Sequence, residues 1–192
     1  MDYFEKLVGT LLERRGYWVQ QSYKIELSKA DKRDLGKPSL PRPEIDLLAY
    51  KGGTSELLVI EVKSYLDSFG VDWKKVCMAH EDMQGRYKLF TNTRYRDLVI
   101  KRLVEQLSRS ESISAHTIPK LCLAAGKFKG GSEEPLKQHF EQKGWGLITP
   151  EEIRDGVAEL ANAGYENDPV ILAAKMLLKG QSQPANNCAC EA

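Results

Sequence analysis

Two acidic residues and a lysine lie in the two most apolar stretches of the sequence, at positions that a β-hairpin would bring together. Asp46 belongs to the apolar run 45–50, and Glu61 and Lys63 end the next run, which follows a glycine-containing turn at 52–55. A turn of this length places Asp46 opposite Glu61, with about 4.5–5.5 Å between paired Cβ atoms. Lys63 points to the same face because side chains alternate along a strand.

This combination of charges in apolar strands is typical of a metal-assisted hydrolase. Two carboxylates and an ammonium group are costly to bury unless something compensates for their lost hydration. Carboxylates bind Mg²⁺, which keeps several of its waters, lowers the pKa of a bound water and stabilises charge on a phosphoryl oxygen. A neighbouring lysine can orient that water or neutralise transition-state charge. We therefore expect Asp46 and Glu61 to bind Mg²⁺ and Lys63 to assist hydrolysis of a phosphodiester.

The Glu-x-Lys spacing alone carries little information. Glu141 and Lys143 have the same spacing in a stretch that we expect to form a surface helix, and the similar pair Asp72 and Lys74 begins another helix. The run at 61–63 differs because it ends a buried strand and has an acid opposite it. The competing interpretation is an ordinary strand end whose charges are solvated.

The pattern of Asp46 followed by Glu61-Val62-Lys63 resembles the PD-(D/E)xK motif of the restriction-endonuclease-like nuclease superfamily, nearest to its Holliday-junction-resolvase and Mrr-type branches. The resemblance covers residues 1–153, although the proline of the motif is displaced to Pro43. It implies an Mg²⁺-dependent DNA endonuclease, with Mn²⁺ able to substitute. The Val62 carbonyl would then add a metal ligand, and a helix acid, Glu5, would join the site.

Glu5 also has a simpler explanation. It follows Asp2 by three residues at the start of the first expected helix, and this spacing is that of a capping box.

The resemblance further implies a homodimer, because cutting duplex DNA requires two strands to be cleaved. The main alternative is a catalytically inactive member of the same fold that binds DNA or protein. A third possibility is an unrelated α/β protein in which the hairpin acids are incidental.

Hydrophobic periodicity predicts a mixed α/β domain in which a restriction-endonuclease-like mixed β-sheet is flanked by helices. Helices are expected where apolar residues recur every three or four positions, and strands where β-branched and aromatic residues cluster. The expected helices are 2–15, 72–90, 94–109, 132–144, one that begins at Pro150 and one from 168 to 180; the expected strands are 17–25, 45–50, 56–63, 119–126 and 145–148.

The chain divides into three expected parts. Residues 1–153 form the nuclease-like core, in which 28–43 is a long polar loop with three prolines. Residues 154–180 form a C-terminal helical extension. The polar tail 181–192 is expected to be disordered.

The charge distribution favours a polyanionic partner, despite a formal net charge of only +1. Residues 71–129 carry twelve basic and six acidic side chains, whereas residues 130–192 carry five basic and ten acidic ones. A local basic surface matters more to DNA than the total charge does. The expected DNA-binding residues are Lys24, Lys29, Lys32, Arg33, Arg86, Lys88, Arg94 and Arg96.

Several classes of protein are disfavoured. No apolar run is long enough to span a membrane, and the first residues lack the pattern of a signal peptide. Four cysteines in 192 residues fit a reducing compartment, so a cytoplasmic location is expected. Glycine-rich phosphate loops and dinucleotide fingerprints are missing from the sequence, and a nucleotide cofactor is therefore not expected.

Overall fold

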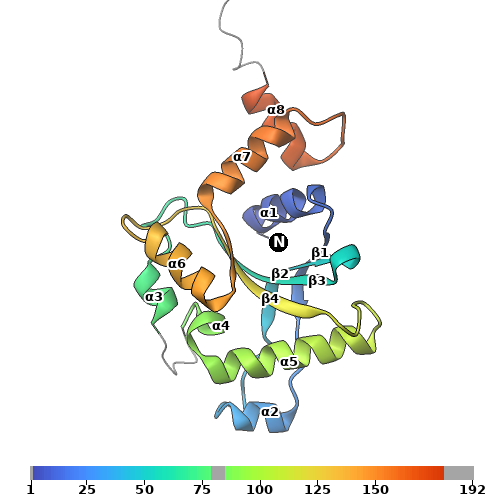
Figure 1. The fold of residues 1–192 in the computed structure, drawn as a ribbon, viewed down its shortest axis with the longest axis vertical. Coiled ribbons are helices and arrows are strands. Elements are labelled where there is room, and N and C mark those ends of the chain that lie inside the picture. Colours follow the sequence, from blue (N-terminus) through green and yellow to red (C-terminus); the bar gives the residue numbers. More distant parts are fainter. Residues whose placement is uncertain (1, 79–84, 180–192) are drawn as a thin grey trace, which may run out of the picture. The chain divides into compact units, whose positions relative to one another are not determined.

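The structure is a computed structural model that describes residues 2–78 and 85–179. A mixed five-stranded sheet lies at the centre of the first of two compact units, Met1–Pro150 (Figure 1). Its strands are β1 (Trp18–Lys24), β2 (Glu44–Lys51), β3 (Glu56–Lys63), β4 (Ile118–Ala125) and β5 (Gly146–Ile148). They lie side by side in chain order; β1, β2 and β3 are antiparallel neighbours, and β3, β4 and β5 are parallel. This arrangement confirms the expected mixed α/β class.

Helices cover both faces of the sheet (Figure 1). The helix α1 packs on one face, where a Cβ added to Gly9 would lie 3.5 Å from Val19 Cγ1 and 3.9 Å from Leu47 Cδ2. The helix α5 covers the other face and contributes Val99 and Leu103, both fully buried, to the main core. Within the described residues the α-helices are α1 (Tyr3–Arg14), α2 (Lys29–Asp34), α3 (Trp73–Cys77), α4 (Lys88–Thr91), α5 (Thr93–Arg109), α6 (Glu133–Lys143), α7 (Pro150–Ala161) and α8 (Pro169–Leu178).

The hairpin that carries the candidate site has the expected register. Lys51 pairs with Glu56, and the ladder continues to Leu47 and Ile60. A short 3₁₀ turn, η1 (Gly52–Thr54), joins the two strands, and the residue that follows it has a left-handed backbone with φ 51°. The turn length therefore fixes which side chains share a face, as the sequence predicts.

The segment 28–43 is more ordered than the long polar loop that we expected. It contains α2, whose capping box joins Ser28 and Asp31 through hydrogen bonds of 2.8 and 3.1 Å. Leu35 and Leu40 are buried in the core. Arg102 of α5 binds both carboxylate oxygens of Asp31, at 2.8 and 3.0 Å, and thereby fastens α2 to α5.

The single helix expected over 72–90 was also wrong. Helix α3 ends at Cys77 because Met78 adopts an extended backbone with ψ 117°, and α4 begins only at Lys88. Part of the interval, 79–84, lies outside the described residues. The expected cap of the next helix is confirmed, since Asn92 accepts a hydrogen bond of 2.9 Å from the Tyr95 N–H.

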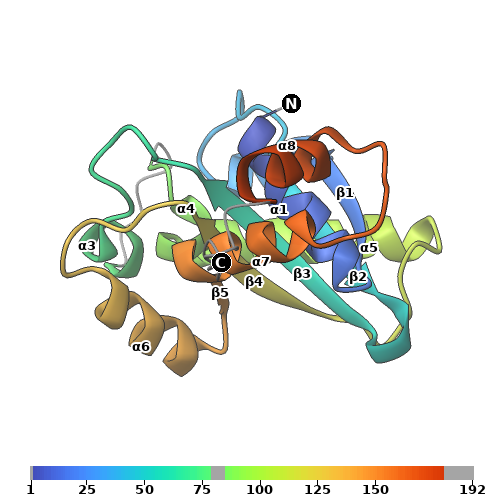
Figure 2. The ribbon, with the colours of Figure 1, turned by 90° about the horizontal axis from the view of Figure 1, so that it is seen from above.

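Helices α3 and α6 lie side by side at one end of the sheet (Figures 1 and 2). Ser132 precedes α6 as expected, but it does not cap that helix through its side chain. Its hydroxyl instead accepts a hydrogen bond of 3.3 Å from the Trp73 N–H. This contact joins the start of α3 to the start of α6.

The second compact unit is Glu151–Ala192, and the predicted boundary after residue 153 falls inside α7. Helix α8 begins as predicted, because Asp168 accepts hydrogen bonds from Val170 N–H and Ile171 N–H at 2.8 and 3.2 Å. The predicted disordered tail, 181–192, lies outside the described residues. In the part of the chain that the structure describes, every helix is too short or too polar to cross a membrane.

Candidate active site

Asp46 lies where the β2–β3 ladder ends. Its carboxylate accepts a hydrogen bond of 2.7 Å from the Val62 N–H. A side-chain oxygen thus replaces the backbone carbonyl that would continue the ladder. This bond holds the carboxylate against the last residues of β3. Glu61 and Lys63 follow the core residue Val59 at steps of two, so strand alternation places them on the face covered by α5.

Three oxygens converge on the ammonium group of Lys63. Its Nζ lies 2.6 Å from Glu61 Oε1, 3.0 Å from the Val62 carbonyl oxygen and 3.6 Å from Asp46 Oδ2. The side chains of Lys63, Glu61 and Asp46 are only 17%, 15% and 21% exposed. The structure therefore brings together the two acids, the carbonyl and the lysine that the sequence singles out.

Burial and mutual charge set the ionisation of this cluster. Burial and the nearby Asp46 carboxylate raise the pKa of Glu61, although Lys63 acts in the opposite direction. Burial alone would lower the pKa of Lys63, but the Glu61 and Asp46 carboxylates together raise it. The lysine is consequently a cation at neutral pH, suited to donating hydrogen bonds and balancing negative charge.

Glu5 approaches the cluster from α1, on the other face of the sheet. Burial raises the pKa of Glu5, with further contributions from Asp46 and Asp2, so its carboxylate lies within electrostatic reach of the site. Asp2 caps α1 by accepting a hydrogen bond of 2.8 Å from the Phe4 N–H. Across residues 2–78 and 85–179, no three His, Cys, Asp or Glu side chains are grouped closely enough to hold a metal ion. Glu5 is thus within electrostatic reach of Asp46 and Lys63 but does not complete a triad of ligands with Asp46 and Glu61.

Gly126 shapes the site, and sequence reasoning missed it. Its N–H donates a hydrogen bond of 2.9 Å to the Lys63 carbonyl at the end of β3. A Cβ at this position would overlap the Ser64 carbonyl oxygen and lie 2.9 Å from Phe4 Cζ. Only glycine lets the end of β4 pass so close to β3 and α1. The available signal was a glycine directly after an apolar strand.

A second lysine, on helix α4, lies close to the site. Burial lowers the pKa of Lys88 on α4, whereas the Glu61 carboxylate raises it, which places Lys88 within electrostatic reach of Glu61. The Lys88 ammonium also lies over the Tyr95 ring, 5.0 Å from its centroid. Lys88 was expected to bind DNA, and its position beside the carboxylates was not anticipated.

Tyr65 was not singled out from the sequence either. It has a left-handed backbone with φ 46° two residues after Lys63. Burial acts to raise the pKa of Tyr65, but hydrogen bonds with Tyr87 and Arg86 and the nearby charge of Lys63 lower it. The hydrogen bonds with Tyr87 and Arg86 hold this phenol beside the residues that directly precede α4.

The other basic residues expected to bind DNA are spread over several elements. Lys29, Lys32 and Arg33 lie on α2, and Lys24, at the end of β1, is 3.8 Å from Glu44. Arg94 pairs with Asp34 of α2. Arg96 donates a hydrogen bond of 3.2 Å to the Phe90 carbonyl and lies 5.3 Å from the centre of the Trp145 ring. Arg94 and Arg96 therefore have structural partners already.

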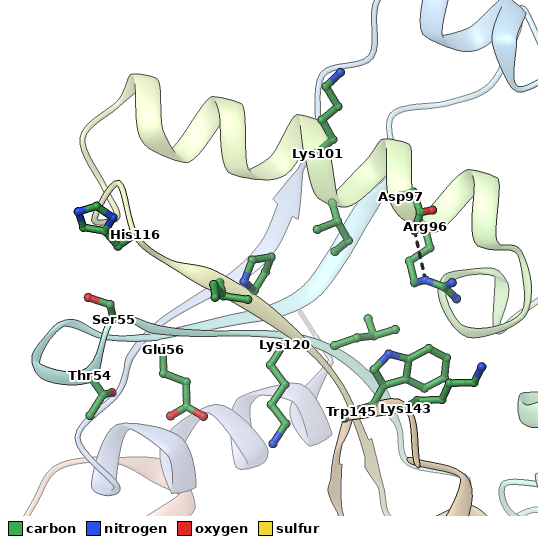
Figure 3. Close-up of a pocket in the computed structure, with 15 residues that line it drawn as sticks. Thr54, Ser55, Glu56, Arg96, Asp97, Lys101, His116, Lys120, Lys143 and Trp145 are labelled. Carbon is green, nitrogen blue, oxygen red and sulfur yellow. Dashed lines mark ion pairs between the residues drawn. The ribbon is translucent and has the colours of Figure 1, made fainter. Parts of the chain in front are cut away.

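A pocket among the described residues lies apart from this cluster. It has a volume of about 960 Å³ and lies at the opposite end of β3, beside Glu56 (Figure 3). Five residues along a strand correspond to about 17 Å between Glu56 and Glu61. The candidate active site is a half-buried cluster at the carboxyl end of β3, and the pocket is a separate feature.

Comparisons of the chain with protein-family models, with curated proteins and with solved structures found no match.

Proposed function

We propose that the protein is a metal-dependent DNA endonuclease whose catalytic residues are Asp46, Glu61 and Lys63. The observation that carries the proposal is the convergence of two carboxylates and the Val62 carbonyl oxygen on one point, the Lys63 ammonium nitrogen. These oxygens are the donor types that hard divalent cations prefer.

The donor set fits Mg²⁺ or Mn²⁺. Mg²⁺ at phosphoryl-transfer sites is commonly bound by one or two carboxylates and completes its shell with waters and substrate oxygens. Asp46 and Glu61 would hold the ion with the Val62 carbonyl, and Glu5 would act on it through its charge. The proposal therefore does not need the three-ligand group that is missing from the described residues.

The reaction would be attack of water on phosphorus in line with the leaving oxygen. The bound cation would lower the pKa of that water and stabilise charge on the phosphoryl oxygens. Lys63 would hold the water or a phosphoryl oxygen by a hydrogen bond, and Lys88 would add positive charge beside Glu61. The new P–O bond forms as the bond to the leaving oxygen breaks, and the proton lost by water ends on that oxygen.

The mixed sheet flanked by helices, with Asp46 and Glu61-Val62-Lys63 at a strand end, supports membership of the PD-(D/E)xK superfamily. The basic surplus in residues 71–129 supports DNA as the partner. By the same analogy we propose a homodimer for cleavage of duplex DNA, and a cytoplasmic location.

A second candidate is a catalytically inactive module of the same fold. One observation favours it: the Lys63 ammonium already lies 2.6 Å from Glu61, so the charges balance each other as a closed ion pair. In such a module the cluster would stabilise the strand end and the basic surface alone would bind DNA.

Incubation of the purified protein with plasmid, branched and single-stranded DNA separates the two. Each substrate is tested with Mg²⁺, Mn²⁺ or EDTA, beside Lys63→Gln and the exposed control Lys74→Gln. Cleavage that requires metal and is lost only in Lys63→Gln supports the endonuclease. Binding of DNA without cleavage of any substrate would favour the inactive module.

A further inference from the structure

The pocket beside Glu56 is an open groove along an uncovered part of β4 (Figure 3). The short strand β5 pairs only with residues 122–124 of β4. Gly144, with a left-handed backbone of φ 67°, ends α6, and β5 begins two residues later. The strand therefore pairs with the second half of β4 and leaves the first half of that edge without a neighbour among the described strands. Within the described part of the chain, residues 118–121 therefore have β3 on one side and no strand on the other.

The groove carries an excess of positive charge. Its lining includes four basic residues and two acidic ones. Arg96 is offset by Asp97, 3.6 Å away, and Glu56 accepts a hydrogen bond of 2.6 Å from the Tyr17 hydroxyl. Lys120 and Lys143 are exposed, and neither takes part in an ion pair within the described residues. In Figure 3 they lie on two sides of β4, and Trp145 lies beside Lys143.

Apolar side chains also line the groove. Ile118 is 80% exposed, and Pro119, Ile100 and the partly buried Trp145 line the same groove. A DNA duplex presents mainly phosphates and groove edges to a protein, because its base faces are stacked inside. An unpaired strand offers both phosphates for lysines and base faces for apolar side chains.

An added peptide strand fits the groove less well. Peptides that extend a sheet bind through backbone hydrogen bonds along a free edge. Pro119 lies in the uncovered part of β4 and has no N–H to contribute to such a ladder.

We propose that this groove binds a single strand of nucleic acid, with Lys120 and Lys143 contacting phosphates and Ile118 contacting a base. The choice of polymer rests on the proposed function, in which the chain acts on DNA. The groove lies about 17 Å from Glu61 along β3, so it would hold a strand away from the bond that is cleaved.

Fluorescence anisotropy with a labelled oligo-dT and a duplex of equal length tests the proposal. The full-length chain carries Lys63→Gln and the buffer contains EDTA, so the result does not depend on cleavage. The double variant Lys120→Gln/Lys143→Gln is compared with Lys74→Gln/Lys75→Gln, which removes two exposed lysines outside the groove. Ile118→Ser tests the apolar contact, and because Ile118 is 80% exposed its loss does not affect the core.

Loss of two phosphate contacts lowers the salt dependence of log K by about 1.4, which corresponds to about 25-fold weaker oligo-dT binding in 0.1 M salt. The control pair is expected to change affinity less than threefold, and Ile118→Ser to weaken oligo-dT more than duplex. Equal effects of the two lysine pairs on oligo-dT binding, or equal affinity of the unmodified groove for duplex and oligo-dT, would overturn the proposal. Either result leaves the cleavage assay unaffected, so failure of the groove and failure of the nuclease are distinguishable.

Discussion

Replacing Lys63 with methionine tests whether the two acids depend on a cation. The stem of the side chain is largely retained, but Asp46 and Glu61 lose the ammonium that lies 3.6 and 2.6 Å from their oxygens. At an effective dielectric of 20 these distances correspond to about 5 and 6 kcal/mol of gross attraction. The hydration that all three groups give up offsets much of that attraction. Because the side chains retain 15–21% exposure, we expect Lys63→Met to lower the free energy of unfolding by about 3 kcal/mol.

Urea denaturation in EDTA measures this loss, with Lys74→Met as the control. Lys74 is exposed, so its replacement is expected to change stability by less than about 0.5 kcal/mol.

The same titration repeated with Mg²⁺ tests the cation site. Without the ammonium, the two carboxylates should bind Mg²⁺ more tightly in the folded state. A concentration ten times the dissociation constant stabilises the variant by about 1.4 kcal/mol. We expect this recovery to be larger in Lys63→Met than in the wild type. Unchanged stability of Lys63→Met in EDTA, or equal effects of Mg²⁺ on both proteins, would refute the reasoning.

Two further changes probe the scaffold. The Arg102 hydrogen bonds lower the pKa of Asp31 from 3.8 to about 2, so the pair stabilises the fold above pH 3.8, and this stability is lost as the pH falls toward 2. Asp31→Asn should therefore flatten the dependence of the urea midpoint on pH between 4 and 2; an unchanged slope would show that the pair contributes little. Gly126→Ala should lower the free energy of unfolding by about 1–3 kcal/mol, because a Cβ overlaps Ser64 and Phe4. Gly130→Ala, whose Cβ meets nothing within 4 Å, is the control, and equal melting of the two variants would contradict the packing argument.

Local patterns were sufficient to predict much of the fold. The length of the 52–55 turn determined the pairing of Lys51 with Glu56, and this register continues to Leu47 and Ile60, the neighbours of Asp46 and Glu61. Helix starts at Asn92 and Asp168 were predictable because their side chains bond to backbone N–H groups only two or three residues away.

Features that depend on distant parts of the chain were not predicted. The helix expected over 72–90 ends at Cys77, although the glycine of that range, Gly85, comes eight residues later. Helix α2 carries a local signal, the Ser28–Asp31 spacing, but its attachment to α5 depends on Arg102, 71 residues further along the chain. The position of Lys88 within electrostatic reach of Glu61 likewise depends on the packing of α4 against α5, which neither sequence spacing nor helix propensity specifies.

The rate of DNA cleavage by Glu61→Gln measures the central claim most directly. Glu141→Gln is its matched control, because Glu141-Gln142-Lys143 has the same spacing as Glu61-Val62-Lys63 but lies on the exposed face of α6. With plasmid DNA and Mg²⁺, we expect Glu61→Gln to lower the initial rate by at least about 100-fold and Glu141→Gln to retain the wild-type rate. Equal rates for the wild type and Glu61→Gln would contradict the assignment of Asp46, Glu61 and Lys63 as the catalytic residues.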